Sequence, residues 1–370
     1  MAGSASATGS RDPRLDFFRG LALVTIFVNH VPGVGIYEDM TTRNFGYSDA
    51  AEAFVLMSGM AAGLAYSKGL LSGDFLKTAV KVWSRAFKLY SVHIAISLAA
   101  VLVLLAGLQF FGETAVFGSV NVRTIVRDPF TGLLGLFSLG HQLGYFNILP
   151  LYMVLLVVTP FLVALAGRNK AALLAGSVAV WAAAGLLQAN FPNYPTQGGW
   201  FLNPLSWQLV YVIGLLAGMS AKRDECLVPF APGLFALSAG FLMWSLVVVR
   251  WQLWPSATIE ALPTVFGGFD KTYLSLQRLL HVLALAYVVC SISSIRKVSG
   301  SLVAAPLVLL GRNSLAVFAT GSVACIVLQV YRSVVPTNFG EDTLLLAGGL
   351  AVQFLAASGG VPRLPFLARA

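Results

Sequence analysis

The sequence predicts an all-α integral membrane protein with about ten transmembrane helices. Of its 370 residues, 57% are hydrophobic and only 11% are charged, and the mean hydropathy is +0.80. In an ordinary soluble domain about a quarter of the residues are charged. The apolar stretches reach the roughly 20 residues that a helix needs to cross a bilayer, which excludes the short alternating strands of an outer-membrane barrel.

Ten apolar stretches are long enough for a transmembrane helix. They fall near residues 15–36, 46–67, 89–111, 146–167, 171–189, 204–221, 228–249, 276–295, 302–331 and 343–360. We expect one transmembrane domain over residues 15–362, a disordered cytoplasmic tail over 1–14 and a second cytoplasmic tail over 363–370. The first ten residues are small and polar, without the basic start and apolar core of a cleavable signal.

The distribution of Lys and Arg predicts the orientation of the chain. With the N-terminus in the cytoplasm, 15 of the 24 basic residues fall on the cytoplasmic side and 7 on the other side. This asymmetry follows the positive-inside rule, so both termini are expected to face the cytoplasm. The net charge of +9 is then a topology signal, and no nucleic-acid partner is expected.

The three cysteines give no chemical site. Cys226, Cys290 and Cys325 lie in or beside apolar segments and are odd in number. Neither a disulfide framework nor a metal cluster follows from them, and no bound metal is expected.

The first predicted helix carries ionisable residues that are costly inside a bilayer. Arg19 and His30 are 11 residues apart, about 1100° at 100° per residue, so both side chains leave one face of the helix about 16 Å apart. Ionisable residues inside spanning helices are functional candidates by default. The plainer alternatives are that Arg19 snorkels or pairs with Asp16, and that His30 is an interfacial histidine.

The second predicted helix offers carboxylates at the membrane level of His30. Asp49 and Glu52 are three residues apart and share one helical face. A carboxylate beside an imidazole fixes its tautomer and makes it a better general base near pH 7. We therefore expect His30, Glu52 and Asp49 to form a catalytic group, although Asp49 with Ser48 could instead be a helix cap.

Two further groups of residues are candidates for binding. A cationic cytoplasmic mouth suited to phosphates is expected from Arg85, Lys88, Arg312 and Asn313, with topology signalling as the alternative for the basic residues. An external sugar substrate is expected to contact His141, Trp200, Trp207, Arg278 and His281. The two tryptophans lie in or beside an uncharged aromatic segment, 190–204, and the alternative for them is an interfacial aromatic belt.

The spacing of Arg19 and His30 resembles that of the membrane acyltransferase-3 superfamily. More closely, five segments are similar to the OpgC family, which is named for succinylation of osmoregulated periplasmic glucans. They are LDFFRGLALVTIFVNHVPG, GYSDAAEAFVLMSGMAAGLAY, ILPLYMVLLVVTP, NPLSWQLVYVIG and LGRNSLAVFATGS. The sequence departs from the superfamily pattern in lacking a histidine between Arg312 and Ser322, and in carrying Asn147 where we expect an acidic residue.

The resemblance implies an enzyme of the bacterial inner membrane that moves an acyl group from cytoplasmic acyl-CoA to hydroxyls of a periplasmic glucan. It implies that His30 is catalytic and that Arg19 lies on the path of the acyl donor. The expected co-substrate is acyl-CoA, with succinyl-CoA favoured over acetyl-CoA, and no cofactor is expected to be tightly bound. The expected partners are the glucan acceptor and membrane lipids. An acyl-histidine intermediate stays open beside the general-base route.

Two other classes of protein fit the same residues. A transporter or flippase of a lipid-linked or small anionic substrate could use Arg19, Glu52 and His30 as a proton or substrate path. A non-catalytic membrane scaffold would need none of them. Release of free thiol from acyl-CoA distinguishes the enzyme from both.

Overall fold

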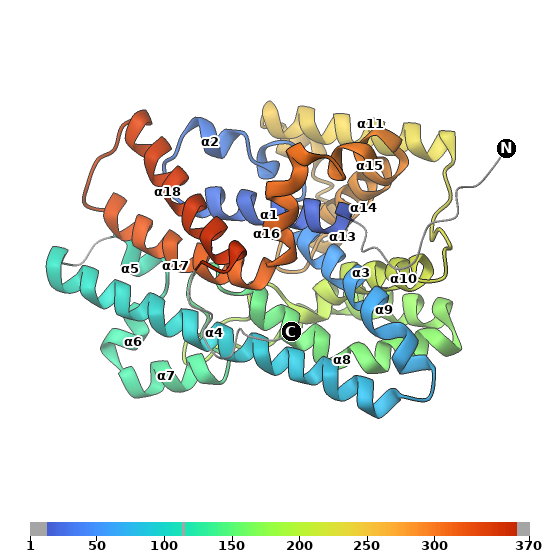
Figure 1. Cartoon of the computed structure of the whole chain (residues 1–370), viewed down its shortest axis with the longest axis horizontal. Coiled ribbons are helices and arrows are strands. Elements are labelled where there is room, and N and C mark those ends of the chain that lie inside the picture. Colours follow the sequence, from blue (N-terminus) through green and yellow to red (C-terminus); the bar gives the residue numbers. More distant parts are fainter. Residues whose placement is uncertain (1–12, 113–114, 361–370) are drawn as a thin grey trace.

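The computed structural model describes residues 13–112 and 115–360, and these residues form helices and no strands. Each of the ten apolar stretches contains at least one helix (Figure 1). The long helices are α1 (Pro13–His30), α3 (Ala50–Leu71), α4 (Phe75–Phe111), α8 (Ile148–Arg168), α9 (Lys170–Leu187), α10 (Pro204–Ala221), α11 (Pro232–Arg250), α14 (Leu276–Ser291), α17 (Ser314–Arg332) and α18 (Phe339–Ser358). The chain is an all-α polytopic membrane protein.

Shorter helices lie in the connections. They are α2 (Ile36–Asp39), α5 (Ala115–Ser119), α6 (Arg123–Arg127), α7 (Pro129–Phe137), α12 (Trp254–Ala257), α13 (Thr264–Gly267), α15 (Ser293–Ser299) and α16 (Ala305–Arg312), with 3-10 turns at Thr42–Asn44 and Leu302–Ala304. Figure 1 shows α5, α6 and α7 near the C-terminal end of α4 and α11 at the opposite edge of the view.

Eight helices of the described residues are long and apolar enough to cross a membrane, and the count rises to nine if α14 and α15 form one span bent by 82°. The first helix, α1, is not among them, and its 18 residues include Arg14, Asp16 and Arg19. The first predicted span is therefore a charged helix, and its polar groups need partners inside the protein.

Two boundaries differ from the prediction. Residues Pro13 and Arg14 already belong to α1, whereas residues 1–12 and 361–370 of the predicted tails lie outside the described residues. The predicted span 89–111 is the second part of α4, which is 37 residues long and begins at Phe75. Charged residues before position 89 hid the start of this helix, because charge ends an apolar stretch without ending a helix.

Glycines bring α3 and α10 into direct backbone contact. Gly59 and Gly63 on α3 face α10, and Gly214 and Gly218 on α10 face α3, each pair at a spacing of four. A Cβ atom on Gly214 would lie 2.1 Å from the carbonyl oxygen of Leu56. Small residues at this spacing let membrane helices approach closely, where packing and not a hydrophobic effect holds them together.

The same device fixes α1 against α16. A Cβ atom on Gly20 would lie 2.0 Å from the carbonyl oxygen of Leu307, and one on Gly311 would lie 1.8 Å from that of Asp16. Because both helices meet at glycine, α1 cannot rotate freely about its axis. The face that carries Arg19 and His30 is therefore fixed within the bundle.

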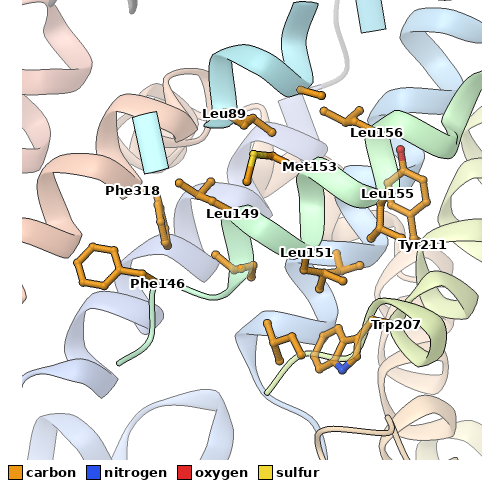
Figure 2. Packing of buried hydrophobic residues seen from close by; sticks show 14 of the residues in the cluster. Leu89, Phe146, Leu149, Leu151, Met153, Leu155, Leu156, Trp207, Tyr211 and Phe318 are labelled. Carbon is orange, nitrogen blue, oxygen red and sulfur yellow. The ribbon is translucent and has the colours of Figure 1, made fainter. Parts of the chain in front are cut away.

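The core is built around α8. Figure 2 shows side chains of α8 between Leu89 of α4 and the two large aromatic residues of α10, Trp207 and Tyr211. Both aromatic side chains are fully buried, and the Tyr211 hydroxyl lies 2.7 Å from the Thr159 hydroxyl of α8. This core supports one end of the bundle, where α8 and α10 begin and α1 and α17 end.

Candidate functional site

A cavity of about 830 Å³ lies at this end of the bundle, which the loop charges predict to face away from the cytoplasm. We call it the outer cavity. Its wall includes the polar residues His30, Asn121, Asn147, Lys271, Gln329, Arg332 and Ser333 and the apolar or aromatic residues Ile26, Tyr145, Ile148, Phe201 and Phe318. Pockets of about 300–1,000 Å³ with a few polar groups are typical ligand sites.

His30 is held in one orientation on the cavity wall. Its Nδ1 atom lies 2.6 Å from the carbonyl oxygen of Ile26, and the centre of its ring lies 4.0 Å from that of Tyr145. A carbonyl oxygen can only accept, so Nδ1 carries the proton and Nε2 keeps its lone pair. The Nε2 atom is therefore the ring nitrogen available to a ligand.

The last turn of α17 holds the backbone that carries His30. The Gln329 side-chain amide donates to the carbonyl oxygen of His30 at 2.7 Å, and Arg332 donates to that of Gly33 at 3.0 Å. Arg332 is itself bonded to Asp342 of α18. Three helices thus meet at the residue that the sequence singles out.

Asp49 and Glu52 do not orient His30 as expected. Glu52 is fully buried, and its carboxylate accepts from the Nε atom of Arg278 at 2.7 Å and from the backbone N–H of Asp49 at 3.0 Å. Together Asp49 and Glu52 form a capping box at the start of α3. The alternative for Asp49, a helix cap, is correct, and Glu52 is its reciprocal partner and the counter-ion of Arg278.

The backbone takes over the role that a carboxylate was expected to play. The Nδ1 atom of His30 is occupied by Ile26, one turn earlier in the same helix. Asp49 remains within electrostatic range of the imidazole, as do Lys271 and Arg43. The sequence places the carboxylates at the level of His30, but side-chain direction sends their hydrogen bonds to α14 and the segment before it.

Lys271 is a cavity residue that the sequence suggests only as one of the outer loop charges. Its ammonium group is hydrogen-bonded to Asp49 and lies 5.8 Å from the centre of the Phe201 ring. Its carbonyl oxygen accepts from the indole N–H of Trp207 at 3.0 Å. A single basic residue inside the aromatic loop segment 251–273 was the available signal.

Arg19 lies deeper in the bundle and lines neither described cavity. It is 9% exposed, and its guanidinium donates to the carbonyl oxygen of Met57 in α3 at 3.3 Å. A smaller lower cavity with room for about one water molecule lies along α1 between the two residues, lined by Leu23, Ile26 and Phe27. It shares Ile26, Tyr145 and Phe318 with the outer cavity.

Along the expected path of the acyl donor, the space beside α1 is thus wide at His30 and narrow toward Arg19. The face shared by the two residues is continuous, because Leu23 and Ile26 lie between them on the same stripe of α1. Of the two described cavities, the outer one at the His30 end of the stripe is large enough for a substrate.

The residues of the expected cytoplasmic mouth line neither described cavity. Arg312 is exposed and pairs with Asp16 at 3.5 Å, whereas the Asn313 side chain donates to the carbonyl oxygen of Leu309 in its own helix. Arg85 and Lys88 lie on α4, three residues apart on one half-buried face. Among the described residues, Arg85 and Lys88 thus lie on α4, whereas Arg312 and Asn313 lie at the end of α16.

Four of the five residues predicted to contact a glycan are buried, the side chain of the fifth, Arg278, is 13% exposed, and all five have partners inside the protein. His141 donates through Nε2 to the carbonyl oxygen of Asn121 at 3.0 Å, and His281 accepts at Nδ1 from the Ser48 hydroxyl at 2.7 Å. The sequence does not distinguish a histidine that faces water from one that contacts a neighbouring loop. The structure buries both imidazole rings, so neither is open to the substrate contact that we expected.

The same correction applies to the other three. Trp200 is 5% exposed and packs edge-on against Phe191, and Trp207 is fully buried. The guanidinium of Arg278 forms an ion pair with Glu52. None of these side chains offers a face to a sugar, and the polar residues that do line the cavity, such as Asn121 and Gln329, come from segments about 200 residues apart.

The fold and cavity define a polytopic membrane protein with a histidine held at the floor of a cavity at one end of the helix bundle. A family model described as OpgC protein matches residues 11–360. The chain therefore belongs to the OpgC family, and this membership indicates a glucan-modifying acyltransferase. Comparisons with curated proteins and with solved structures gave no match.

Proposed function

We propose that the protein is an O-acyltransferase of the bacterial inner membrane that moves a succinyl group from cytoplasmic succinyl-CoA to a hydroxyl of a periplasmic glucan. Acyl-CoA is its co-substrate, and no tightly bound cofactor takes part. The observation that carries the proposal is the position of His30 on the wall of the outer cavity, with Nδ1 bonded to the carbonyl oxygen of Ile26, which leaves Nε2 of the neutral ring for the substrate.

The proposed chemistry needs one base and no metal. A glucan hydroxyl attacks the thioester carbonyl carbon while Nε2 of His30 takes the hydroxyl proton. The tetrahedral intermediate then collapses, the C–S bond breaks, and the imidazolium returns its proton to the departing thiolate. The products are an ester and free CoA thiol, and general-base catalysis of this kind contributes about 10²–10⁴-fold to the rate.

The acceptor side of this proposal draws on the side-chain amides of the cavity. Asn121, Asn147 and Gln329 line it, and each amide carries both a donor and an acceptor. Such groups suit sugar hydroxyls, which also donate and accept. The volume of the cavity accommodates a few sugar residues and a short acyl chain together.

The donor side depends on the stripe from Arg19 to His30. The proposal requires the lower cavity to widen when the pantetheine arm enters, because in this structure it has room for about one water molecule. Arg19 would then meet the donor at the inward end of the stripe. Replacing Arg19 with Ala should therefore lower kcat/KM for acyl-CoA more than it lowers kcat/KM for the glucan.

The experiment is an acyl-transfer assay with protein purified in detergent. The protein is mixed with acyl-CoA and a neutral glucan, free thiol is measured with a colorimetric reagent, and the glucan is examined by mass spectrometry. The proposal predicts glucan-dependent thiol release and a mass increase of the glucan. A protein that moves substrate across vesicles without releasing thiol is a transporter or flippase, and the proposal is then wrong.

A further inference from the structure

We propose that Lys271 binds an anionic group of a substrate in the outer cavity and selects charged substrates over neutral ones. The effect of Lys271 on acyl transfer rests on the proposed function, whereas the binding of an anion by Lys271 does not. It assigns a subsite for a carboxylate or phosphate, carried either by the acyl group or by the acceptor.

The charges on the cavity wall have one sign. Among the described residues that line the outer cavity, Lys271 and Arg332 are positively charged and none carries a carboxylate. Their counter-ions, Asp49 and Asp342, stand behind them and are not part of the described wall. The positive ends of both ion pairs therefore face the space that a ligand would fill.

The two cations differ in how firmly the protein holds them. The described contacts tie the guanidinium of Arg332 to three partners, Asp342, Thr337 and Gly33. A lysine ammonium has three N–H groups, and the described residues give Lys271 one acceptor, Asp49. Lys271 is thus the lining cation with fewer described partners, and two of its N–H groups remain for a ligand.

The position of Lys271 is fixed from two sides. The indole N–H of the fully buried Trp207 donates to its carbonyl oxygen at 3.0 Å, and its ammonium is bonded to Asp49. Its side chain is 26% exposed, so the ammonium is partly withdrawn from solvent yet open to the cavity. A cation held this way needs little reorganisation when an anion arrives.

The network behind Lys271 contains two cations and two carboxylates, and Asp49 is not the counter-ion of Lys271 alone. Asp49 also lies 3.6 Å from Arg278, and Arg278 is bonded to Glu52. Asp49 therefore shares its charge between two cations. Asp49 is the counter-ion that a part-buried lysine requires. A substrate anion can bind Lys271 beside Asp49 without breaking the ion pair between Arg278 and Glu52.

His30 lies within electrostatic range of the same ammonium. Both residues also line the outer cavity, so the far carboxylate of a four-carbon acyl chain would meet Lys271 while its thioester carbon stays beside His30. An anionic substituent on the acceptor would enter from the open side of the same cavity. Because the recognising chemistry is the same for both, the experiment separates the two sources.

The experiment compares Lys271→Met with the wild-type protein on matched substrates. Succinyl-CoA and butyryl-CoA have acyl chains of equal length that differ by one carboxylate, and both are tested with a neutral glucan. A second arm uses butyryl-CoA with a neutral glucan and with a glucan bearing phosphate groups. Lys271→Arg is the variant that keeps the positive charge. Lys222→Met is the control, because it removes an exposed lysine directly after the C-terminal end of α10.

The proposal predicts that Lys271→Met lowers kcat/KM for the anionic substrate of one arm by about 10–100-fold, as for loss of a charged hydrogen bond. The neutral substrate of that arm should change less than about threefold. Lys271→Arg should recover most of the loss, and Lys222→Met should match the wild type. The arm that shows the effect identifies the anion as belonging to the acyl group or to the acceptor.

Equal losses on charged and neutral substrates in both arms would overturn the subsite and make Lys271 a structural residue. Binding is measured in parallel by calorimetry with succinyl-CoA, butyryl-CoA and the two glucans. If the wild type transfers no acyl group but prefers an anionic ligand and Lys271→Met loses that preference, the subsite stands and the proposed reaction falls. A wild type that binds charged and neutral ligands alike overturns the subsite whether or not it turns over.

Discussion

The Nδ1 atom of His30 donates to the carbonyl oxygen of Ile26, one turn earlier in α1, at 2.6 Å. This bond fixes the tautomer without placing a full negative charge beside the ring. A carboxylate in the same place would stabilise the imidazolium, whereas a backbone carbonyl orients the ring and adds only a dipole. The imidazole is thereby kept ready to accept a proton at Nε2.

The backbone carbonyl of His30 is the next link, and Gln329 is its partner. Replacing Gln329 with Leu should release the end of α1 and lower kcat about tenfold, since small misplacements of a base are costly. Steady-state kinetics check this. Gln208→Leu is the control, because Gln208 also joins two helices but bonds to Ser177 away from the cavity. Equal effects of both variants would show that His30 is not positioned by Gln329.

Glu52 is expected to act on stability and not on the reacting histidine. Glu52→Gln leaves the largely buried Arg278 without its closest counter-ion, which should cost about 3 kcal/mol of unfolding free energy. A double-mutant cycle with Arg278→Gln, measured by chemical unfolding in detergent, should give a coupling energy of at least about 1 kcal/mol. If the Glu52→Gln protein has wild-type stability and a greatly reduced kcat, the prediction is wrong and Glu52 belongs to the catalytic group.

The contact between α3 and α10 should not tolerate a single added methyl group. Gly214→Ala places a Cβ atom 2.1 Å from the carbonyl oxygen of Leu56, so the helices must separate at a cost of about 1–3 kcal/mol. Gly240→Ala on α11 meets nothing within 4 Å and should be neutral. Thermal unfolding of the two variants tests this difference, and equal melting temperatures would contradict the close packing.

His141 should make the loop before α8 sensitive to acid. Burial lowers the pKa of His141 below its usual 6.5, so the folded protein binds fewer protons at this site than the unfolded chain. The stability that the neutral ring contributes is present above about pH 6.5 and is lost as the pH falls below that value. Hydrogen exchange of residues 138–147 should therefore quicken between pH 7.5 and 5.5, after correction for intrinsic rates. A His141→Gln protein that shows the same step would assign the effect to another group.

The membrane architecture could be predicted because it depends on composition along the chain. A run of about 20 apolar residues favours a spanning helix, and each predicted stretch contains at least one helix. The face shared by Arg19 and His30 was equally accessible, since helical periodicity alone defines it. The structure agrees with that face, and it adds the glycine contacts of α1 with α16 that fix its direction.

The cavity wall could not be predicted in the same way. Its polar residues lie in loops and helix ends whose folding depends on contacts between distant segments, such as Trp207 with Lys271. The carboxylates of α3 were placed at the right depth, but their choice of Arg278 and Lys271 as partners depends on how α14 packs. A sequence gives the spacing on one helix and leaves open which neighbour each side chain meets.

The most direct test of the account is the acyl-transfer rate of purified His30→Ala protein. Thermal unfolding is measured beside it to establish that the variant is folded. We predict that transfer to the glucan falls by at least about 10²-fold, to the rate without enzyme, while the melting temperature stays near that of the wild type. A folded His30→Ala protein that acylates the glucan within about threefold of the wild-type rate would contradict the central claim that this histidine is the base.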